Sequence, residues 1–176
     1  AALAAGHAVD GVEGKYNMQP IHWACREGHL PLAKLLVEHG ADVRAENSEG
    51  VQPIHLASGY NHVPILEWLV LEMRVRLNVR CSRGSTPLHE ASYEGHHATV
   101  QWIVEHDSDL VALRTNKHKG WKPGYGDATP LRFAELQGHE AVVRYLKASP
   151  YYVRAAQEAA EAAEAKAKKL VEDEKA

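Results

Sequence analysis

The 176-residue chain has few cysteines, a single phenylalanine and no long apolar run. Cys25 and Cys81 form no CxxC motif, and their spacing provides neither a disulfide framework nor a zinc site. A membrane-spanning helix needs about 20 consecutive apolar residues, so none is predicted. We therefore expect reduced cysteines and an intracellular protein, in the cytoplasm, the nucleus or an organelle interior.

The chain also lacks a strong excess of charge of either sign. It has 20 basic and 23 acidic residues, which gives a net charge of −3. This balance creates no global field that would attract nucleic acid or an anionic membrane, so any basic function requires a local patch. Hydrophobic residues make up 45% of the chain, which predicts a packed core over most of its length.

Motifs that carry catalytic chemistry are missing as well. The chain contains no glycine-rich phosphate loop after a strand, no G-x-S-x-G motif and no carboxylate pair that stands apart from the solvated charges. Its 12 histidines raise the hypothesis of a metal or acid–base site. Most of them, however, recur in phase with a repeat. We therefore predict no enzyme activity, no cofactor and no metal.

The most informative feature that is present is this internal repeat. Four segments align: QPIHWACREGHLPLAKLLVEHGADV, QPIHLASGYNHVPILEWLVLEMRV, TPLHEASYEGHHATVQWIVEHDSDL and TPLRFAELQGHEAVVRYLKASP. Their prolines fall at 20, 53, 87 and 130, with spacings of 33, 34 and 43. Periods of 33 and 34 that carry T-P-L-H-x-A resemble ankyrin repeats. The resemblance covers roughly residues 6 to 150 and implies an all-α solenoid of about four helix-turn-helix repeats with hairpin fingers.

The repeat motif predicts where helices begin and end. Thr86 suits an N-cap, Pro87 suits the first helical position, and Gly95 suits the left-handed position after the helix. Gln19 and Gln52 stand where a capping Thr is expected, and each loss of the hydroxyl would cost about 1 kcal/mol. We interpret seven histidines as braces of the repeat loops: His22, His55, His89, His29, His62, His96 and His139.

These boundaries divide the chain into three parts. A partial repeat or finger is expected at 1–18, four repeats at 19–51, 52–85, 86–128 and 129–150, and an Ala/Glu/Lys-rich helix within 151–176. The third repeat exceeds the period by about ten residues, which places an extended finger at about 113–128. Strong helix formers predict a long C-terminal helix from about 151 to 173. With no complete repeat before it, the first repeat is expected to expose Ile21 and Leu32.

The resemblance implies that partners bind the finger tips and the exposed side of the first helices. Aromatic and arginine side chains at these positions are the best candidates, because they bury large areas in binding hot spots. We expect Tyr60 and Tyr93 to be exposed, whereas Trp23 fits packing and exposure equally well. The candidate partner-binding residues of this concave face are Tyr16, Trp23, Arg26, Tyr60, Arg83 and Tyr93.

The extended finger adds a second group of candidates, in which lysines supply charge and aromatic rings supply flat apolar surface. These residues are Lys117, Lys119, Trp121, Lys122 and Tyr125. Such a combination can clamp an acidic protein segment or bind single-stranded nucleic acid, and it is also compatible with an ordinary surface loop. Nucleic acid is the less favoured partner, because nothing else on the chain extends a basic track.

The sequence therefore predicts a non-catalytic protein-interaction or scaffolding module. Its partner is another protein, of unknown identity, within a larger complex, and the contact surface is the concave face with the extended finger. One alternative is a permanent structural or accessory subunit of a large assembly, including an organellar one. The other is a nucleic-acid or ribonucleoprotein contact through the basic finger.

Overall fold

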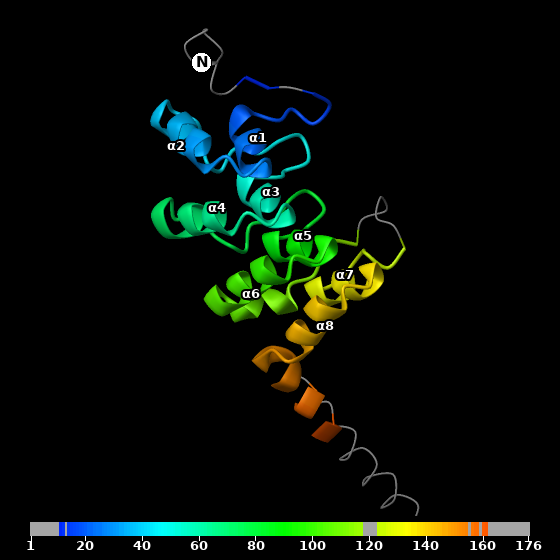
Figure 1. Ribbon diagram of the computed structural model, residues 1–176. Coiled ribbons are helices and arrows are strands. Elements are labelled where there is room, and N and C mark those ends of the chain that lie inside the picture. Colours follow the sequence, from blue (N-terminus) through cyan, green and yellow to red (C-terminus); the bar gives the residue numbers. More distant parts are fainter. Residues whose placement is uncertain (1–10, 13, 118–122, 155, 159, 162–176) are drawn as a thin grey trace, which may run out of the picture.

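The computed structural model describes residues 11–12, 14–117, 123–154, 156–158 and 160–161. Within these residues, short helices follow one another as antiparallel pairs that stack into an elongated array (Figure 1). The first helices of the pairs are α1 (Pro20–Arg26), α3 (Pro53–Gly59), α5 (Pro87–Glu94) and α7 (Pro130–Gln137). The predicted all-α repeat solenoid is confirmed.

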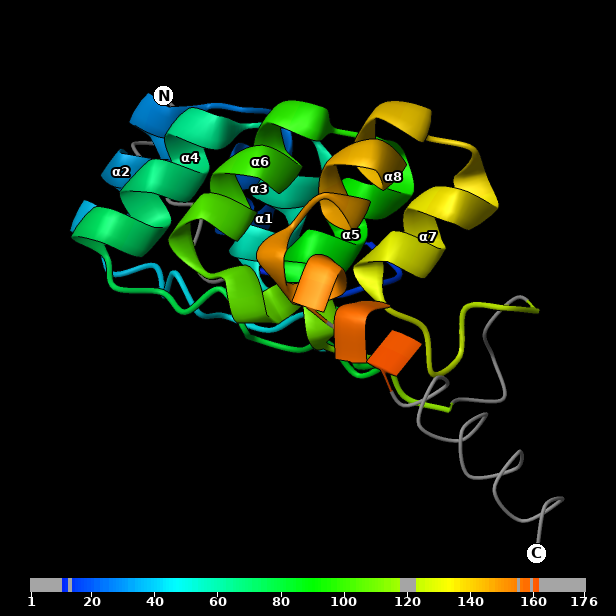
Figure 2. The ribbon, with the colours of Figure 1, turned by 90° about the horizontal axis from the view of Figure 1, so that it is seen from below.

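The second helices form the other layer of the array. They are α2 (Leu30–Glu38), α4 (Val63–Glu67) with the π-helix η2 (Trp68–Glu72), α6 (His97–His106) with the 3-10 helix η3 (Ser108–Ala112), and α8 (Glu140–Lys147). Figure 2 shows α4, α6 and α8 side by side in this layer. The main hydrophobic core lies between the layers and runs along the stack.

The helix ends follow the predicted chemistry. Thr86 and Thr129 occupy N-cap positions with a proline after each, and Gly95 ends α5 in the left-handed conformation, at φ 78°. A Cβ at Gly95 would collide with the imidazole of His139 on the next repeat. Glycine is therefore required there for both backbone and packing reasons.

Three buried histidines of the T-P-L-H positions hold the repeats together. The backbone N–H groups of Gln19, Gln52 and Thr86 donate to Nδ1 of His22, His55 and His89 at 3.2, 3.1 and 3.3 Å, respectively. Nδ1 therefore accepts, and Nε2 must carry the proton. The three Nε2–H groups donate to the carbonyl oxygens of Val51, Ser85 and Ala128 at 3.0, 3.3 and 3.1 Å. Each imidazole thus bridges the start of a first helix to the finger that leads into the next repeat.

The histidines of the Gly-His positions form a second set of braces. His62, His96 and His139 donate through Nε2 to the carbonyl oxygens of Arg26, Gly59 and Tyr93 on the preceding first helix, at 2.8, 3.0 and 2.8 Å. His29 is exposed. The bracing role predicted from the repeat accounts for six of the seven histidines, because three of them bind the finger that leads into the next repeat and three bind the preceding first helix.

The extra residue of the second repeat is absorbed by the π-helix η2. In the first repeat the N–H of Ala41 donates to the carbonyl of Leu36, whereas the equivalent bond in the second repeat joins Val75 to Leu69, at 2.9 Å in both. The second span is one residue longer, and the wider π turn accommodates it. Arg74 then occupies the left-handed position that Gly40 holds in the first repeat, with φ 56° and 97° respectively.

Backbone hydrogen bonds also join successive fingers into a row. The N–H groups of Ser48, Ser82 and Asn116 donate to the carbonyl oxygens of Tyr16, Glu49 and Arg83 at 3.0, 2.9 and 2.9 Å. The bond that closes the finger base joins Asn47 to Val51, Cys81 to Ser85 and Thr115 to Ala128. These equivalences place the inserted residues of the extended finger between Thr115 and Ala128.

The expectation for the flank of the first repeat was half wrong. Ile21 is fully buried, at 0% exposure, whereas Leu32 is 42% exposed. Ile21 is equivalent to Ile54 in the next repeat, and both side chains point into the core between the helix layers. The packing between the helix layers buries Ile21, whereas Leu32 lies on the exposed side of α2.

The described part of the C-terminal region is helical at 150–154, 156–158 and 160–161. Tyr152 anchors this segment, because its hydroxyl donates to the carbonyl of Val111 in η3 at 3.0 Å. Residues 162–176 lie outside the described part, so the long helix to about residue 173 stays a prediction. Among the helices that the structure describes, none combines the length and the apolar character needed to cross a membrane.

Candidate protein-binding groove

A groove of about 500 Å³ lies on the concave face, between the finger tips and the helices α1, α3 and α5. Five of the sequence candidates, which come from three different repeats, line it together. They are Tyr16, Trp23, Arg26, Tyr60 and Arg83. The repeat geometry thus gathers side chains that are up to 67 positions apart in the chain on one surface.

The groove is open because one repeat has a glycine at a position where the equivalent residues of the other repeats carry large side chains. The residue two positions before the helix-ending turn is Arg26 in α1, Gly59 in α3, Tyr93 in α5 and Leu136 in α7. Gly59 therefore leaves an opening between the side chains of its neighbours in this row. It lines the groove, and its own backbone is not left-handed. Here glycine is needed to make space and not for backbone conformation.

Aromatic rings and a guanidinium form the N-terminal end of the groove. The Cζ atom of Arg26 lies 5.2 Å from the ring centre of Trp23 and 4.9 Å from that of Tyr60. These are cation–π distances, so Arg26 ties α1 to α3 through their rings. Tyr16 and Tyr60 are 44% and 46% exposed, respectively. The exposure predicted for Tyr60 is confirmed, and this end offers flat apolar area to a ligand.

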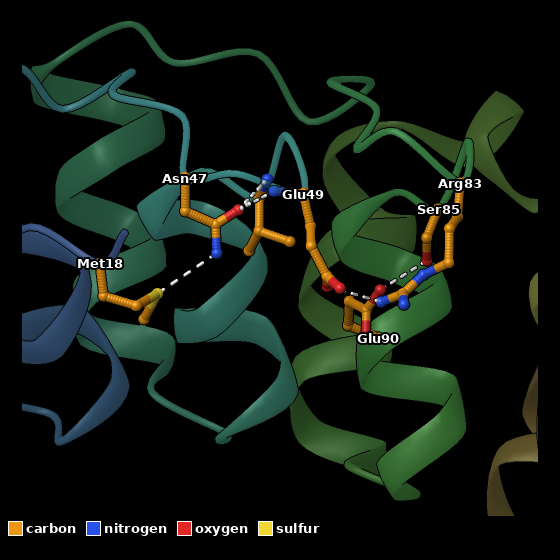
Figure 3. Close-up of polar contacts among 7 residues, drawn as sticks. Met18, Asn47, Glu49, Arg83, Ser85 and Glu90 are labelled. Carbon is orange, nitrogen blue, oxygen red and sulfur yellow. Dashed lines mark hydrogen bonds and ion pairs between the residues drawn. The ribbon is translucent and has the colours of Figure 1, made fainter. Parts of the chain in front are cut away.

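Carboxylates form the C-terminal end of the groove (Figure 3). The hydroxyl of Ser85 donates to Oε1 of Glu90 at 2.6 Å, and a guanidinium nitrogen of Arg83 lies 3.4 Å from Oε2 of Glu49. Burial raises the pKa of Glu90, and the nearby charges of Glu94 and Glu49 raise it further, against the opposing effects of Ser85 and Arg83. The carboxylates of Glu49, Glu90 and Glu94 therefore lie near one another, with the guanidinium of Arg83 beside them.

A rigid finger supports this acidic end. The side-chain oxygen of Asn47 accepts the N–H groups of Glu49 and Val51, both at 2.9 Å, and closes the turn. Its amide nitrogen lies 3.3 Å from the sulfur of Met18 on the preceding finger (Figure 3). Asn47 thus fixes both its own finger and the neighbouring one, which holds Glu49 in place over the groove.

The sequence analysis did not select the groove carboxylates Glu49, Glu90 and Glu94 as candidates. A signal was nevertheless present for Glu90, which occupies the position one residue after the motif histidine. The other repeats carry Trp23, Leu56 and Phe133 there. A single charged residue in an otherwise apolar register row is unusual, because a stacked first helix normally packs this position against its neighbour.

The C-terminal half of the concave face is filled. Tyr125 was predicted to present its ring to a partner, but it is only 6% exposed and packs with Phe133, Tyr93 and Leu136. The ring centres of Tyr125 and Phe133 are 4.9 Å apart in an edge arrangement, and the Gln137 amide nitrogen donates to the Tyr125 hydroxyl at 2.5 Å. The finger folds back onto α7, so Tyr125 serves packing. Tyr93 is half-buried against it, contrary to the expected exposure.

The base of the extended finger is firmly anchored. The Thr115 hydroxyl donates to the carbonyl of Tyr125 at 2.6 Å and accepts the N–H of Ala128 at 3.1 Å. The side chain of Lys117 is 81% exposed and its ammonium lies 3.5 Å from a carboxylate oxygen of Asp127. Lys119, Trp121 and Lys122 lie outside the described residues. The predicted contact through this finger, with protein or nucleic acid, therefore stays a prediction.

The groove has the chemistry of a binding surface. In the described part of the chain, no cluster of three or more His, Cys, Asp or Glu side chains is arranged to hold a metal ion. Burial raises the pKa of Cys25 to about 12, which leaves its thiol protonated and unreactive at neutral pH. The walls instead combine exposed rings with charges of both signs, which suits recognition of a peptide or protein surface.

Family comparisons agree with this fold. Residues 21–70 match the family described as "Ankyrin repeats (many copies)", and residues 71–157 match "Ankyrin repeats (3 copies)". The fold and the concave groove define a helical-repeat protein whose repeats serve protein–protein interaction. The chain belongs to the ankyrin-repeat family.

Curated relatives share only a short segment with this chain. Palmitoyltransferase ZDHHC13 of Homo sapiens is 46% identical over 48 residues, palmitoyltransferase Hip14 of Drosophila melanogaster 48%, and palmitoyltransferase ZDHHC17 of Danio rerio 40%, each over the same length. The shared segment is 27% of this chain and 8% of each relative. It is shorter than two repeat lengths, so the likeness concerns repeat sequence.

Proposed function

We propose that this chain is a non-catalytic protein-interaction module that binds an extended segment of a partner protein in the concave groove. The observation that carries the proposal is the clustering of Tyr16, Trp23, Arg26, Tyr60 and Arg83 around one cavity of about 500 Å³. Two of these rings are nearly half exposed beside a rigid finger row. Preorganised aromatic and arginine side chains are the usual anchors of binding hot spots.

The shape of the groove favours a segment over a globular surface. The groove is lined by residues of three successive first helices and of the fingers beside them, and Gly59 lies among these residues. An extended peptide can follow it from α1 to α5 and place side chains in the gaps between helices. The matching segment in palmitoyltransferases supplies no further argument about the partner, because it covers 8% of those proteins.

Filling the groove from its floor tests this function. A Cβ at Gly59 would meet only the Glu90 Cβ, at 3.5 Å, which is ordinary van der Waals contact. Gly59→Leu should therefore fold normally, with an unfolding free energy within about 1 kcal/mol of the unmodified chain. It should also occlude the cavity, because the added side chain extends into the space between Arg26 and Tyr93.

The matched control is Ala141→Leu, which adds a similar side chain at an exposed position of α8 outside the groove. Proteins that cross-link specifically to the unmodified chain and to Ala141→Leu, identified by mass spectrometry, should be lost with Gly59→Leu. Urea unfolding followed by circular dichroism verifies that both variants fold. Equal recovery of the same partners by all three proteins would refute binding in the groove.

A further inference from the structure

The two ends of the groove carry opposite charge. At the N-terminal end, Lys15 and Arg26 lie beside the rings of Tyr16 and Trp23. Among the described residues, Arg26 pairs with the carboxylate of Glu27, at 3.8 Å, and this partly exposed pair compensates little of the positive charge. The N-terminal end of the groove is therefore cationic and aromatic.

The C-terminal end is anionic. Glu49, Glu90 and Glu94 line it, and Arg83 is the nearby cation that partly balances them. Arg83 is engaged with Glu49, and Glu90 accepts the Ser85 hydroxyl (Figure 3). The exposed Glu94 on α5 therefore extends the negative potential toward solvent. A cation delivered by a ligand would be attracted here, because the partly desolvated site screens charge less than water does.

Between these ends the groove is apolar. Leu56 on α3 and Tyr60, which directly follows that helix, line this part, and Gly59 adds no side chain there. An occupant that matches all three parts has separated charges of opposite sign with apolar atoms between them. A uniformly acidic or uniformly basic segment would be attracted at one end and repelled at the other.

We infer that the groove selects a partner segment with a charge polarity, in which an acidic side chain lies over Lys15 and Arg26 and a basic side chain lies over Glu90 and Glu94. This inference rests on the proposed function and specifies its ligand class: an extended, charge-polarised peptide of another protein with an apolar residue at its centre.

The repeat spacing sets the length of that segment. Neighbouring packed helices lie about 8 to 10 Å apart, so α1 and α5 are separated by about 16 to 20 Å. An extended chain advances about 3.3 Å per residue, so the acidic and basic residues should be about five or six positions apart. The apolar residue should fall near the middle of this span, opposite Tyr60.

Selection from a random 12-residue peptide library displayed on phage tests the inference on the full chain. Peptides are first selected for binding to the unmodified protein, and those that also bind the Gly59→Leu variant are then removed. The remaining peptides need the open groove to bind. We expect at least a tenfold enrichment of peptides with an acidic and a basic residue separated by about five positions. Groove-dependent peptides without this charge pair would overturn the inference and leave the proposed function standing. A selection that yields no groove-dependent peptide would overturn both.

Charge reversal at one end gives a second, independent readout. With Glu94→Lys, the selected peptides should carry an acidic residue in place of the basic one at the matching position. The same substitution should reduce the affinity of a charge-polarised peptide at least tenfold, as measured by fluorescence anisotropy at low salt. The matched control is Glu67→Lys, at an exposed position of α4 that does not line the groove, which should leave both unchanged. An unchanged preference in Glu94→Lys would contradict the assigned polarity.

Discussion

The concave face of the array is hollow between repeats one and three and filled between repeats three and four. In the hollow half, Gly59 leaves the groove open between exposed aromatic rings. In the filled half, Tyr93 occupies the equivalent position and Tyr125 packs onto it and onto Phe133. Both halves are built from helix pairs of the same kind, and the same kind of histidine hydrogen bond braces the repeats in each. One register position and one finger insertion therefore decide which part of the face can accept a ligand.

The filled half shows what the inserted finger does for the fold. In the described part of this finger, Tyr125 lies over α7, where it packs against the ring of Phe133 and accepts a hydrogen bond from Gln137. A ligand is not needed to bury these rings. In the hollow half, Tyr16 and Tyr60 are not covered in this way by any described finger and are 44% and 46% exposed, so we expect them to contribute to binding more than to stability.

Removing Phe133 should produce the largest effect. Phe133 is 1% exposed and packs at the centre of the filled half, so Phe133→Ala should lower the free energy of unfolding by about 3 to 5 kcal/mol through lost burial and a residual cavity. Urea denaturation measures this change. The comparison variant Tyr60→Ala, in the hollow half, should cost no more than about 1 kcal/mol. Similar losses in both variants would contradict the division of the face.

Acidification should weaken both halves together. Burial lowers the pKa of His55, which lines the groove, and of His89, whose ring contacts Phe133 in the filled half, to about 4 in each case. The imidazoles of the unfolded chain titrate near pH 6.5, so the unfolded state binds more protons than the folded state between pH 6.5 and 4. The free energy of unfolding therefore decreases as the pH is lowered through this window. Each histidine should remove roughly 2 kcal/mol between pH 7.5 and pH 5.

Urea denaturation at a series of pH values measures this loss. His89→Gln should flatten the dependence of the unfolding free energy on pH, whereas His39→Gln, at an exposed position of the first repeat, is the matched control and should keep it. An unfolding free energy that stays constant from pH 7.5 to 5 would show that the buried imidazoles are not neutral braces.

The smallest expected effect is a gain in stability in the second repeat, away from the concave face. Arg74 holds a left-handed backbone, at φ 56°, where the first repeat has Gly40. Arg74→Gly should relieve this strain and stabilise the fold by about 0.5 to 1 kcal/mol, seen as a higher urea midpoint at an unchanged slope. Arg76→Gly is the control, because Arg76 is not left-handed and the substitution should instead be mildly destabilising. A lower midpoint for Arg74→Gly would exclude strain at this position.

Much of the fold was predictable because its signals are local and periodic. The prolines at helix starts, the glycines after helix ends and the in-phase histidines each fix a short segment, and repetition makes their alignment secure. The π turn at 68–72 was less accessible. It follows from one extra residue in the second repeat, and the sequence alone does not reveal whether a loop or a helix absorbs it.

The candidate site was predictable only in part. Position within the repeat identified Tyr16, Trp23 and Tyr60, because the concave face follows from the register. It failed for Tyr125, since no local signal shows that an inserted finger folds back over the next helix. Glu90 was overlooked because solvated glutamates are common, and its unusual place appears only when equivalent positions of all repeats are compared.

The sequence by itself determined the ankyrin-type solenoid, the bracing histidines and the concave face as the surface of interest, because each depends on residue spacing within one period. Tertiary structure decided which part of that face is open. That outcome depends on stacking, which brings Arg26 onto Tyr60 and leaves the space above Gly59, and on the return of the finger that seals the rings of repeats three and four. Contacts between side chains so far apart in the chain are fixed only when the repeats pack together.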